Sequence, residues 1–514
     1  MTITANSRLA NLGSLASQKP WILIVPVLLV STGLGFYKLG AESLWIDELY
    51  SVYDALQIDL NPLEIVGRFS QVRPIYYLLL RIWTLLGQGE IWLRTLSVLV
   101  GVGSVFLTYH LGRKIAGVTV GIVAALMLAL SPMSIYFSQM VRMYGLGMFF
   151  GILGSLFLAL ALETPRAKYL AGWSIARSLV FLTAPLNITL LVPDLILLGL
   201  TFRRRPQVFK EVGKWLLLLC LLCLPSVSSL VADALPFLKK ALGLVENVAA
   251  AQRTTSFNLP LDLFRKVRKF TIFPFPSTSV LESRVLQAYT LVMISVMGIA
   301  FYKNRHASRI FWAAAWAFIP WFVHGAVSSR MLFDRYVFYT APYLLILLAA
   351  GLVRVVRMHR VVAAVIAIAY AVIVMMGLAR YYNVQDRQDW RALFEFVNQN
   401  EQPGDVIIYS MELVNPDKFS NALKYYHKGD AAMINIRELC ESRNITTPEA
   451  MLELQQVSAN LDETWLLCGS GFDQDKFQTV LGDYGQVEGH WQFVNNGFYR
   501  QEDYMNLFKI NLNS

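Results

Sequence analysis

Two adjacent carboxylates, Asp47 and Glu48, stand shortly after the first long apolar run of the chain, Trp21 to Leu39. A charge at the edge of a membrane helix costs free energy, so it is expected to be kept for a use. Trp45 and Tyr50 flank the pair, as aromatic side chains do at membrane–water interfaces. A carboxylate at this depth could act as a general base on a substrate dissolved in lipid. The simpler alternative is that both charges complement the positive end of a helix dipole.

A second group of residues has the chemistry of an anion site. Arg142 with Tyr144, and Arg335 with Tyr336, lie beside apolar runs, and Arg73 precedes a short apolar segment. A guanidinium group presents a planar fork that fits phosphate oxygens. We therefore predict that the three arginines bind a phosphate, and Tyr144 and Tyr336 are candidates for the same site. The alternatives are that the arginines extend toward water or pair with acidic residues, and that the tyrosines are interfacial anchors.

Four further cations, Arg265, Lys266, Arg268 and Lys269, form a cluster between two apolar runs. They could assist the same phosphate site or attract anionic lipid headgroups. The histidines do not cluster, and the sequence has no phosphate-binding glycine loop or metal-type spacing of Cys and His. The lack of a nucleotide motif argues against an ATP-driven pump. A divalent metal held by Asp47 and Glu48 is left open, and the residues present do not require one.

Composition predicts a polytopic α-helical membrane protein. Of the 514 residues, 55% are hydrophobic, and repeated apolar runs reach the length that spans a bilayer. The net charge of +10 comes from Lys and Arg concentrated in short loops. This pattern is typical of cytoplasmic loops and not of nucleic-acid binding.

Eleven spans are expected, and 13 if two ambiguous segments also cross, because Pro74–Leu86 is short for a crossing and prolines interrupt residues 170–202. The eleven predicted spans are 21–39, 93–111, 115–132, 145–162, 170–185, 186–202, 215–231, 285–302, 310–327, 336–353 and 361–379.

Placing every basic loop on the inner side puts the N-terminus in the cytoplasm. The protein is expected in the inner membrane of the cell. Five segments then lie on the outer, periplasmic side: 41–92, 133–144, 232–284, 328–335 and 380–514. The predicted site residues therefore share one face of the membrane.

The chain is expected to have two domains. Residues 1–380 form the membrane domain, whose first outer loop, 41–73, carries the carboxylates, and residues 381–514 form a soluble domain on the outer face. In that domain, residues 389–409 predict a helix, a turn and a buried strand, and residues 463–468 predict a second strand, which indicates a small α/β fold. A disulfide between Cys440 and Cys468 is left open.

Five segments occur in an order that resembles the GT-C superfamily of membrane glycosyltransferases, in the branch of protein O-mannosyltransferases, lipid A aminoarabinose transferases and RgtA-like enzymes. The segments are SLWIDELYS, RPIYYLLLRIW, GEIWLRTLSVLVG, SPMSIYFSQMVRMYGL and DRYVFYTAPYLLILLAAGL. The resemblance covers residues 20–380.

The resemblance implies a sugar donor carried on a polyprenyl phosphate and a reaction on the periplasmic or lumenal face. It implies that Asp47 and Glu48 are the catalytic pair, and that the RMY and RY segments match the family's arginines and tyrosines. Two positions depart from the family: Arg73-Pro74 replaces a Pro-Pro pair, and Pro185-Leu186-Asn187 stands where many relatives have a histidine. The sugar and the acceptor, whether glycan, lipid or protein, therefore stay open.

The predicted function is inverting transfer of a sugar onto an acceptor hydroxyl. Asp47 would act as the base, Glu48 would orient Asp47 or the acceptor, and the arginines would stabilise the departing phosphate. Two alternatives are a flippase or transporter for lipid-linked saccharides, and an oligosaccharide ligase or polymerase. A transporter is disfavoured because the chain has no clear internal repeat.

Overall fold

The computed structural model describes residues 21–241, 259–272, 280–327, 334–384, 387–410, 416–436, 439–440, 448–458, 464–469, 481, 486–495 and 504–511. The chain divides into two compact units. The membrane unit comprises Met1–Tyr37 and Ile58–Tyr381, and the C-terminal unit comprises Lys38–Gln57 and Tyr382–Ser514. The C-terminal unit is therefore built from two stretches of chain that lie far apart in the sequence.

All the secondary structure described in the membrane unit is helical. Its elements are α2 (Trp21–Phe36), α4 (Pro62–Arg68), α5 (Pro74–Thr84), α6 (Glu90–Ala116), α7 (Val118–Leu130), α8 (Pro132–Ser138), α9 (Tyr144–Glu163), α10 (Ala167–Thr183), the 3-10 helix η1 (Pro185–Leu190), α11 (Leu191–Phe202), α12 (Pro206–Ala241), α13 (Leu259–Ile272), α14 (Val280–Ile299), α15 (Ala307–Val327), α16 (Asp334–Val337), η3 (Phe338–Thr340), α17 (Ala341–Met358) and α18 (Arg360–Asn383).

Six of the described helices are long and apolar enough to cross a membrane, and a seventh crossing results if α7 and α8, which meet at 63°, form one broken span. Each of the eleven predicted spans overlaps a helix, including the shorter or more polar α2, α10, α12 and α15. The chain is thus a multi-pass membrane protein, as its composition predicts. The segment expected to be too short for a crossing is α5, a helix of 11 residues.

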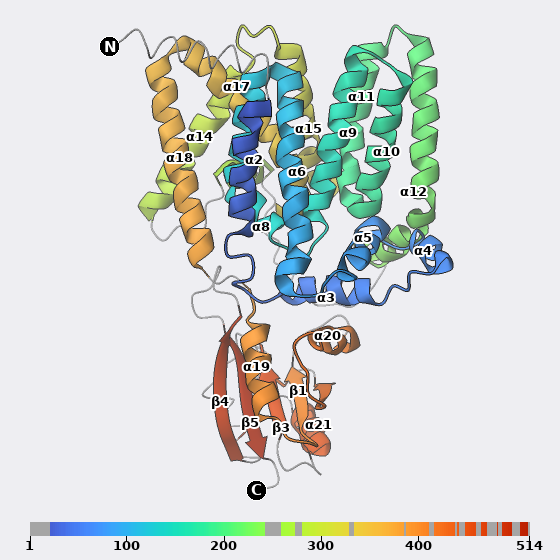
Figure 1. The fold of residues 1–514 in the computed structure, drawn as a ribbon, viewed down its shortest axis with the longest axis vertical. Helices are drawn as coiled ribbons and strands as arrows, with labels where there is room; N and C mark the ends of the chain where they lie inside the picture. The colour runs from blue at the N-terminus through green and yellow to red at the C-terminus, as the bar shows by residue number, and fades with distance from the viewer. Residues whose placement is uncertain are drawn as a thin grey trace. The chain divides into compact units, whose positions relative to one another are not determined.

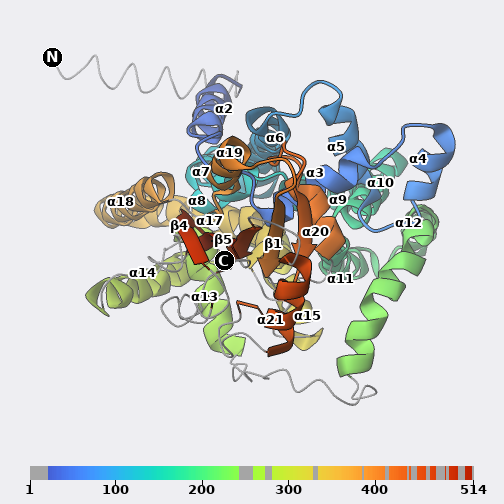
Figure 2. The ribbon, with the colours of Figure 1, turned by 90° about the horizontal axis from the view of Figure 1, so that it is seen from below.

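Helix α17 forms the centre of the bundle, whereas α18 lies at its edge. In the most apolar window of each span, 83% of the residues are buried inside the protein for Asp334–Met358 and only 28% for Arg360–Asn383. Figures 1 and 2 both place α18 and α12 at opposite edges of the membrane unit. The apolar side chains of α18 therefore face lipid, while those of α17 fill the core.

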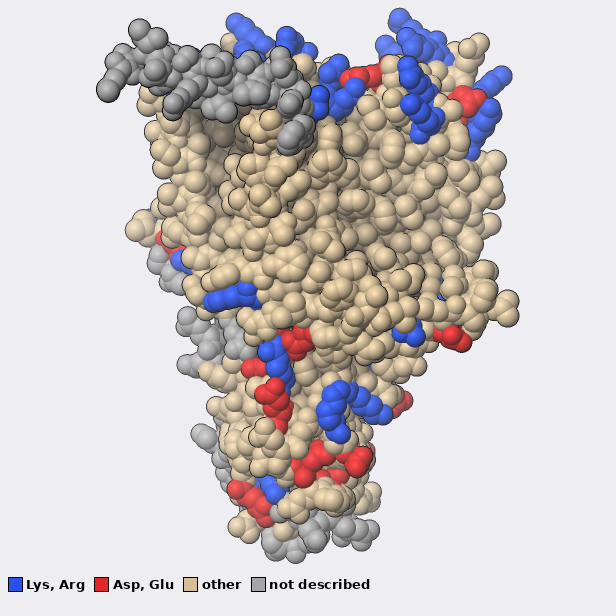
Figure 3. Space-filling model, viewed as in Figure 1, with Lys and Arg blue, Asp and Glu red and all other residues tan. Residues whose placement is uncertain are grey.

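Basic side chains gather at one end of the bundle, beyond a broad band that carries few charges (Figure 3). At this end Glu163 of α9 forms ion pairs with Lys114 of α6 and with Arg309 of α15, the second at 3.1 Å. Three loops predicted to share one side of the membrane thus meet at the same end of the helices.

The bend between α7 and α8 has a local cause. Pro132 lacks the backbone N–H that would continue α7, and the Ser131 side chain caps the new helix by accepting a hydrogen bond from the Ser134 backbone N–H at 3.3 Å. Helix α8 then ends at Ser138, and the chain reaches Arg142 just before α9 begins.

The C-terminal unit contains a five-stranded mixed sheet in the order β2-β1-β3-β5-β4. Strand β1 is parallel to β2 and β3, and β5 is antiparallel to β3 and β4. Its elements are α3 (Ile46–Leu56), α19 (Trp390–Asn400), β1 (Val406–Ser410), α20 (Pro416–Leu423), β2 (Ala432–Asn435), α21 (Pro448–Ser458), β3 (Thr464–Cys468), β4 (Gln486–Val494) and β5 (Tyr504–Asn511). The prediction of a helical membrane protein with a small C-terminal α/β fold is confirmed.

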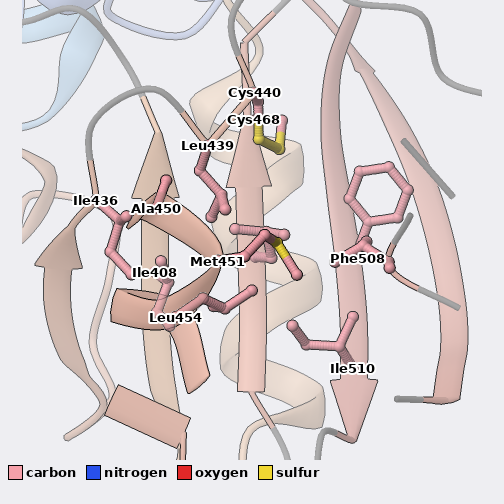
Figure 4. Close-up of a cluster of buried hydrophobic side chains, with 12 residues drawn as sticks. Ile408, Ile436, Leu439, Cys440, Ala450, Met451, Leu454, Cys468, Phe508 and Ile510 are labelled. Carbon is pink, nitrogen blue, oxygen red and sulfur yellow. A yellow bond between two sulfur atoms is a disulfide. The ribbon is translucent and has the colours of Figure 1, made fainter. Parts of the chain in front are cut away.

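One apolar core packs against this sheet. Met451 and Leu454 of α21 lie over Ile408 of β1 and Phe508 of β5 (Figure 4). Cys440 and Cys468 form a disulfide at the edge of the same core. Buried apolar side chains of this kind supply the main stabilisation of a small domain.

Candidate active site

Helix α3 carries both predicted carboxylates in its first turn. The helix begins at Ile46 with Trp45 as its N-cap, so Asp47 and Glu48 occupy the second and third helical positions. The Glu48 carboxylate accepts a hydrogen bond from the Trp45 backbone N–H at 3.2 Å. Negative charge at this end complements the helix dipole, and the Glu48 carboxylate also accepts one N–H group at the helix start. The carboxylates therefore have the helix-dipole role that the sequence analysis gave as the simpler alternative.

Glu48 is fully buried and is held by an arginine from the other stretch of the C-terminal unit. The distance from its carboxylate to a terminal nitrogen of Arg387 is 3.2 Å, and Arg387 is itself only 5% exposed. The same guanidinium lies 3.4 Å from Glu42. A buried charge is tolerated when it is paired in this way, and losing one partner leaves the other without compensation.

Asp47 lies on a different face of α3 and is only partly buried. With a helical repeat of about 3.6 residues, Asp47 shares its face with Tyr50 and Asp54 and not with Glu48. Asp54 binds the Lys418 ammonium of α20 at 2.8 Å, and the same ammonium lies 5.0 Å from the centre of the Tyr50 ring. The two adjacent carboxylates therefore have separate environments.

The Tyr50 hydroxyl is strongly held in its protonated form. Burial raises the pKa of Tyr50 to about 12, and the nearby carboxylates of Asp47 and Asp54 contribute to this rise. Tyr50 is therefore a hydrogen-bond donor beside Asp47 at neutral pH.

The RMY segment lies where α8 turns into α9 in the membrane unit. The Arg142 guanidinium lies 5.7 Å from the centre of the Tyr144 ring, a cation–π distance. Tyr144 is buried, and its ring contacts Phe137 with 5.3 Å between centroids. Phe137 in turn lies 4.4 Å from Phe338 of η3. The aromatic contacts thus connect the RMY segment to the element that follows the RY segment.

Arg335 and Tyr336 occupy α16 and repeat the same pairing, with 5.1 Å between the guanidinium and the centre of the ring. The preceding residue, Asp334, forms ion pairs with both Lys266 and Lys269 of α13. Two members of the predicted basic cluster are therefore anchored beside Arg335. The other two members are Arg265 and Arg268. Burial lowers the pKa of Arg268, and the neighbouring charge of Arg265 lowers it further.

Arg73 has an unusual backbone. It is the N-cap of α5 with φ 61°, in the left-handed region, directly before Pro74. A non-glycine residue in this region costs of order 1–3 kcal/mol, and such residues cluster at functional sites. The Arg73 Nε is buried and makes no hydrogen bond within the part of the chain that the structure describes.

The predicted site residues thus form two groups. Asp47 and Glu48 belong to the C-terminal unit, and the predicted phosphate-binding residues belong to the membrane unit. Within the membrane unit, Phe137 connects the RMY segment to η3, the element after the RY segment, while Arg73 lies on a separate element, α5.

The surroundings of Glu48 bear on whether the carboxylate pair could hold a metal. Among the described residues, no three side chains of His, Cys, Asp or Glu come together as ligands. Both the Trp45 N–H and the Arg387 guanidinium contact the Oε2 atom of Glu48.

Three polar features escaped the sequence analysis. The first is Arg387, which is 339 residues from its partner Glu48. The second is a fully buried ion pair inside the helical bundle, between Arg177 of α10 and Asp194 of α11 at 2.6 Å. Arg177 and Asp194 are charged residues inside apolar runs, and this pattern in the sequence could have revealed the ion pair.

The third feature is a cluster of three hydrogen-bonded side chains at the ends of η1, α15 and η3. His324 Nε2 lies 3.2 Å from the hydroxyls of both Thr189 and Tyr339, and those two hydroxyls are hydrogen-bonded to each other at 2.5 Å. These hydrogen bonds account for the burial of the polar His324 side chain.

Known proteins resemble this chain in part of its sequence and throughout its fold. The family model described as dolichyl-phosphate-mannose-protein mannosyltransferase matches residues 71–230. No curated protein sequence matches the chain.

Two solved structures share the fold. The crystal structure of ArnT from Cupriavidus metallidurans bound to undecaprenyl phosphate has a TM-score of 0.56 at 11% identity, and the match covers 96% of this chain and 99% of that one. The oligosaccharyltransferase from Archaeoglobus fulgidus, in complex with Zn and sulfate, has a TM-score of 0.51 at 12% identity over 94% of this chain and 74% of that one. The chain is thus a multi-pass membrane protein that shares the fold of ArnT and, over residues 71–230, matches the mannosyltransferase family model.

Proposed function

We propose that the protein transfers a sugar from a polyprenyl-phosphate donor to an acceptor hydroxyl at the outer face of the inner membrane, with inversion of the anomeric carbon. The observation that carries this proposal is the likeness to ArnT, a protein whose structure contains undecaprenyl phosphate and whose fold covers both units of this chain. A fold alone does not define a reaction, so the residues must supply the chemistry.

The base in this reaction is Asp47. We assign this role to Asp47 because it is only partly buried, whereas Glu48 is fully buried and bound by Arg387. The acceptor oxygen attacks the anomeric carbon as its proton moves to Asp47. The bond between that carbon and the phosphate oxygen breaks, and its electron pair leaves with the polyprenyl phosphate.

The leaving group needs charge stabilisation and no proton, because a phosphate already carries negative charge. We assign this role to Arg142 and Arg335, each of which is backed by a tyrosine ring. We assign assisting roles to Arg73 and to the α13 cations, which belong to the same unit. Preorganised cations of this kind are among the largest contributions to enzymatic rates.

The test is transfer of radiolabelled sugar from synthetic polyprenyl-phosphate donors by membranes that contain the wild type or Asp47→Asn. We expect Asp47→Asn to lower the transfer rate by about 10²–10⁴-fold, the usual contribution of a general base. Asp59→Asn is the matched control, because Asp59 is an exposed carboxylate of the same loop region. Nucleotide sugars serve as control donors.

Three results would count against parts of the proposal. Turnover that survives in Asp47→Asn would remove Asp47 as the base. Turnover of nucleotide sugars alone would remove the lipid donor. Binding of polyprenyl donors with no transfer to any acceptor would favour a transporter, or a ligase that needs a larger saccharide.

A further inference from the structure

We propose that Arg387 is a positioning residue for Asp47, and that the stretch Tyr382–Ser514 of the C-terminal unit fixes the orientation of helix α3. The inference rests on the proposed function only for the statement that Asp47 is the base. The structural part concerns contacts within one compact unit, which is formed by Lys38–Gln57 and Tyr382–Ser514.

The start of α3 is held by side chains that follow the last membrane helix. Arg387 binds the buried Glu48 at 3.2 Å, and the neighbouring Gln388 side chain accepts a hydrogen bond from the Ile46 backbone N–H at 3.2 Å. Glu48 also accepts the Trp45 N–H, so this carboxylate joins the helix N-terminus to Arg387. Asp47 therefore lies between Ile46, which is held by Gln388, and Glu48, which is held by Arg387.

The turn that leads into α3 is held in the same way. The Ser43 hydroxyl donates to the Gln388 carbonyl at 2.5 Å, and the Leu44 backbone N–H donates to the Tyr426 hydroxyl at 2.7 Å. Arg391 of α19 donates to the Gly40 carbonyl at 3.1 Å. Contacts to backbone groups fix the path of the chain whatever its side chains are.

The later turns of α3 have an independent attachment to α20. Lys418 binds Asp54 at 2.8 Å and lies over the Tyr50 ring. Helix α3 is therefore attached at its first turn through Arg387 and near its end through Lys418. Two attachments along a helix of 11 residues restrict both its tilt and its rotation.

This arrangement has a consequence for catalysis. A general base must be held within about 0.5 Å of its productive position, and misplacement by about 1 Å can cost 10²-fold in rate. Arg387 contacts Glu48 and Glu42 and would act on the reaction only through the placement of Asp47.

The first test needs no substrate. Hydrogen–deuterium exchange of the full chain in detergent is compared between the wild type and Arg387→Ala. We expect faster exchange at the first amides of α3 in the variant, while exchange in the strands of the sheet stays unchanged. Lys424→Gln is the matched control, because Lys424 is an exposed cation of the same unit. Among the described contacts, its ammonium bonds only to Asn421.

The second test is kinetic. We expect Arg387→Ala to lower kcat by about 10–100-fold with little change in the KM for the donor, because the proposed donor contacts lie in the membrane unit. Arg387→Lys should restore part of kcat, since an ammonium keeps the charge and loses the fork. Arg387→Gln combined with Glu48→Gln should be more active than Arg387→Gln alone, because the double variant leaves no buried charge unpaired.

The outcomes separate this inference from the proposed function. Unchanged exchange in α3 with unchanged kcat in Arg387→Ala would overturn the positioning role. A rise in donor KM at constant kcat would also overturn it, because Arg387 would then bind the donor. If the wild type transfers no sugar, the proposed function fails, and the exchange result still decides whether Arg387 holds α3.

Discussion

At the scale of single residues, two neighbouring carboxylates have different surroundings. Glu48 is buried against Arg387, whereas Asp47 faces the side of α3 that carries Tyr50. The sequence identified the pair because two acids beside an apolar run are conspicuous. It could not divide their roles, because Arg387 stands 339 residues further along the chain and no local pattern connects them.

Tyr50 provides a test of this environment through pH. The folded-state pKa of about 12 lies above the ordinary value of 10.0, so the folded protein keeps a proton that the unfolded chain loses. The stabilisation is complete below about pH 10 and is lost as the pH rises through about 12. We expect the unfolding temperature of Tyr50→Phe to decrease less between about pH 10 and pH 12 than that of the wild type.

The measurement is thermal unfolding at a series of pH values, with Tyr37→Phe as the control because Tyr37 is 53% exposed. An equal loss of stability with pH in the wild type and in Tyr50→Phe would contradict the expectation.

At the scale of elements, a single ion pair joins five helices. The Asp194 carboxylate on α11 binds Arg177 of α10 and accepts the indole N–H groups of Trp173 and Trp316, the latter on α15. Arg177 also donates to the Gly151 carbonyl and the Ser155 hydroxyl of α9. Ser155 in turn bonds to Tyr343 of α17 at 2.9 Å. Such a fully satisfied network can persist in a bundle that excludes water.

We expect Asp194→Ala to destabilise the protein by about 3–5 kcal/mol, because it leaves the Arg177 charge and two indole N–H groups buried without partners. Glu163→Gln is the comparison, since Glu163 pairs with Lys114 and Arg309 at the half-exposed end of the bundle. Loss of that pair should cost at most about 1 kcal/mol. Tryptophan fluorescence during thermal unfolding in detergent measures both, and equal effects would contradict the assignment.

The helices were more predictable than the strands. Apolar runs of spanning length located every one of the eleven expected helices, because lipid forces the backbone to satisfy its own hydrogen bonds. In the C-terminal unit, α19, β1 and β3 were predicted correctly from buried runs and a turn. Strands β2, β4 and β5 were missed. Strands β2 and β4 have no fully buried face, so their sequences lack an apolar repeat.

At the scale of the whole molecule, the C-terminal unit has its own covalent link. Cys440 and Cys468 are 28 residues apart, and β3 ends at Cys468 in the middle of the sheet. A disulfide that closes a loop of this length stabilises by about 2–4 kcal/mol. The sequence left this bond open, because spacing alone cannot show whether two cysteines meet.

We expect a reducing agent to lower the unfolding temperature of the C-terminal unit in the wild type and to have no effect in Cys440→Ala combined with Cys468→Ala. Cys220 and Cys223 stay as free thiols in both proteins and control for other thiol chemistry. An equal response to reduction in both proteins would show that the disulfide contributes nothing.

The division of the C-terminal unit between two distant stretches of chain has a consequence for biosynthesis. A ribosome delivers Lys38–Gln57 to the membrane long before it has made Arg387, Tyr426 and Lys418. During that interval Glu48 lacks Arg387, the arginine that binds it in the finished protein. The carboxylate pair therefore reaches its final geometry only at the end of translation, so an incomplete chain cannot hold Asp47 in place.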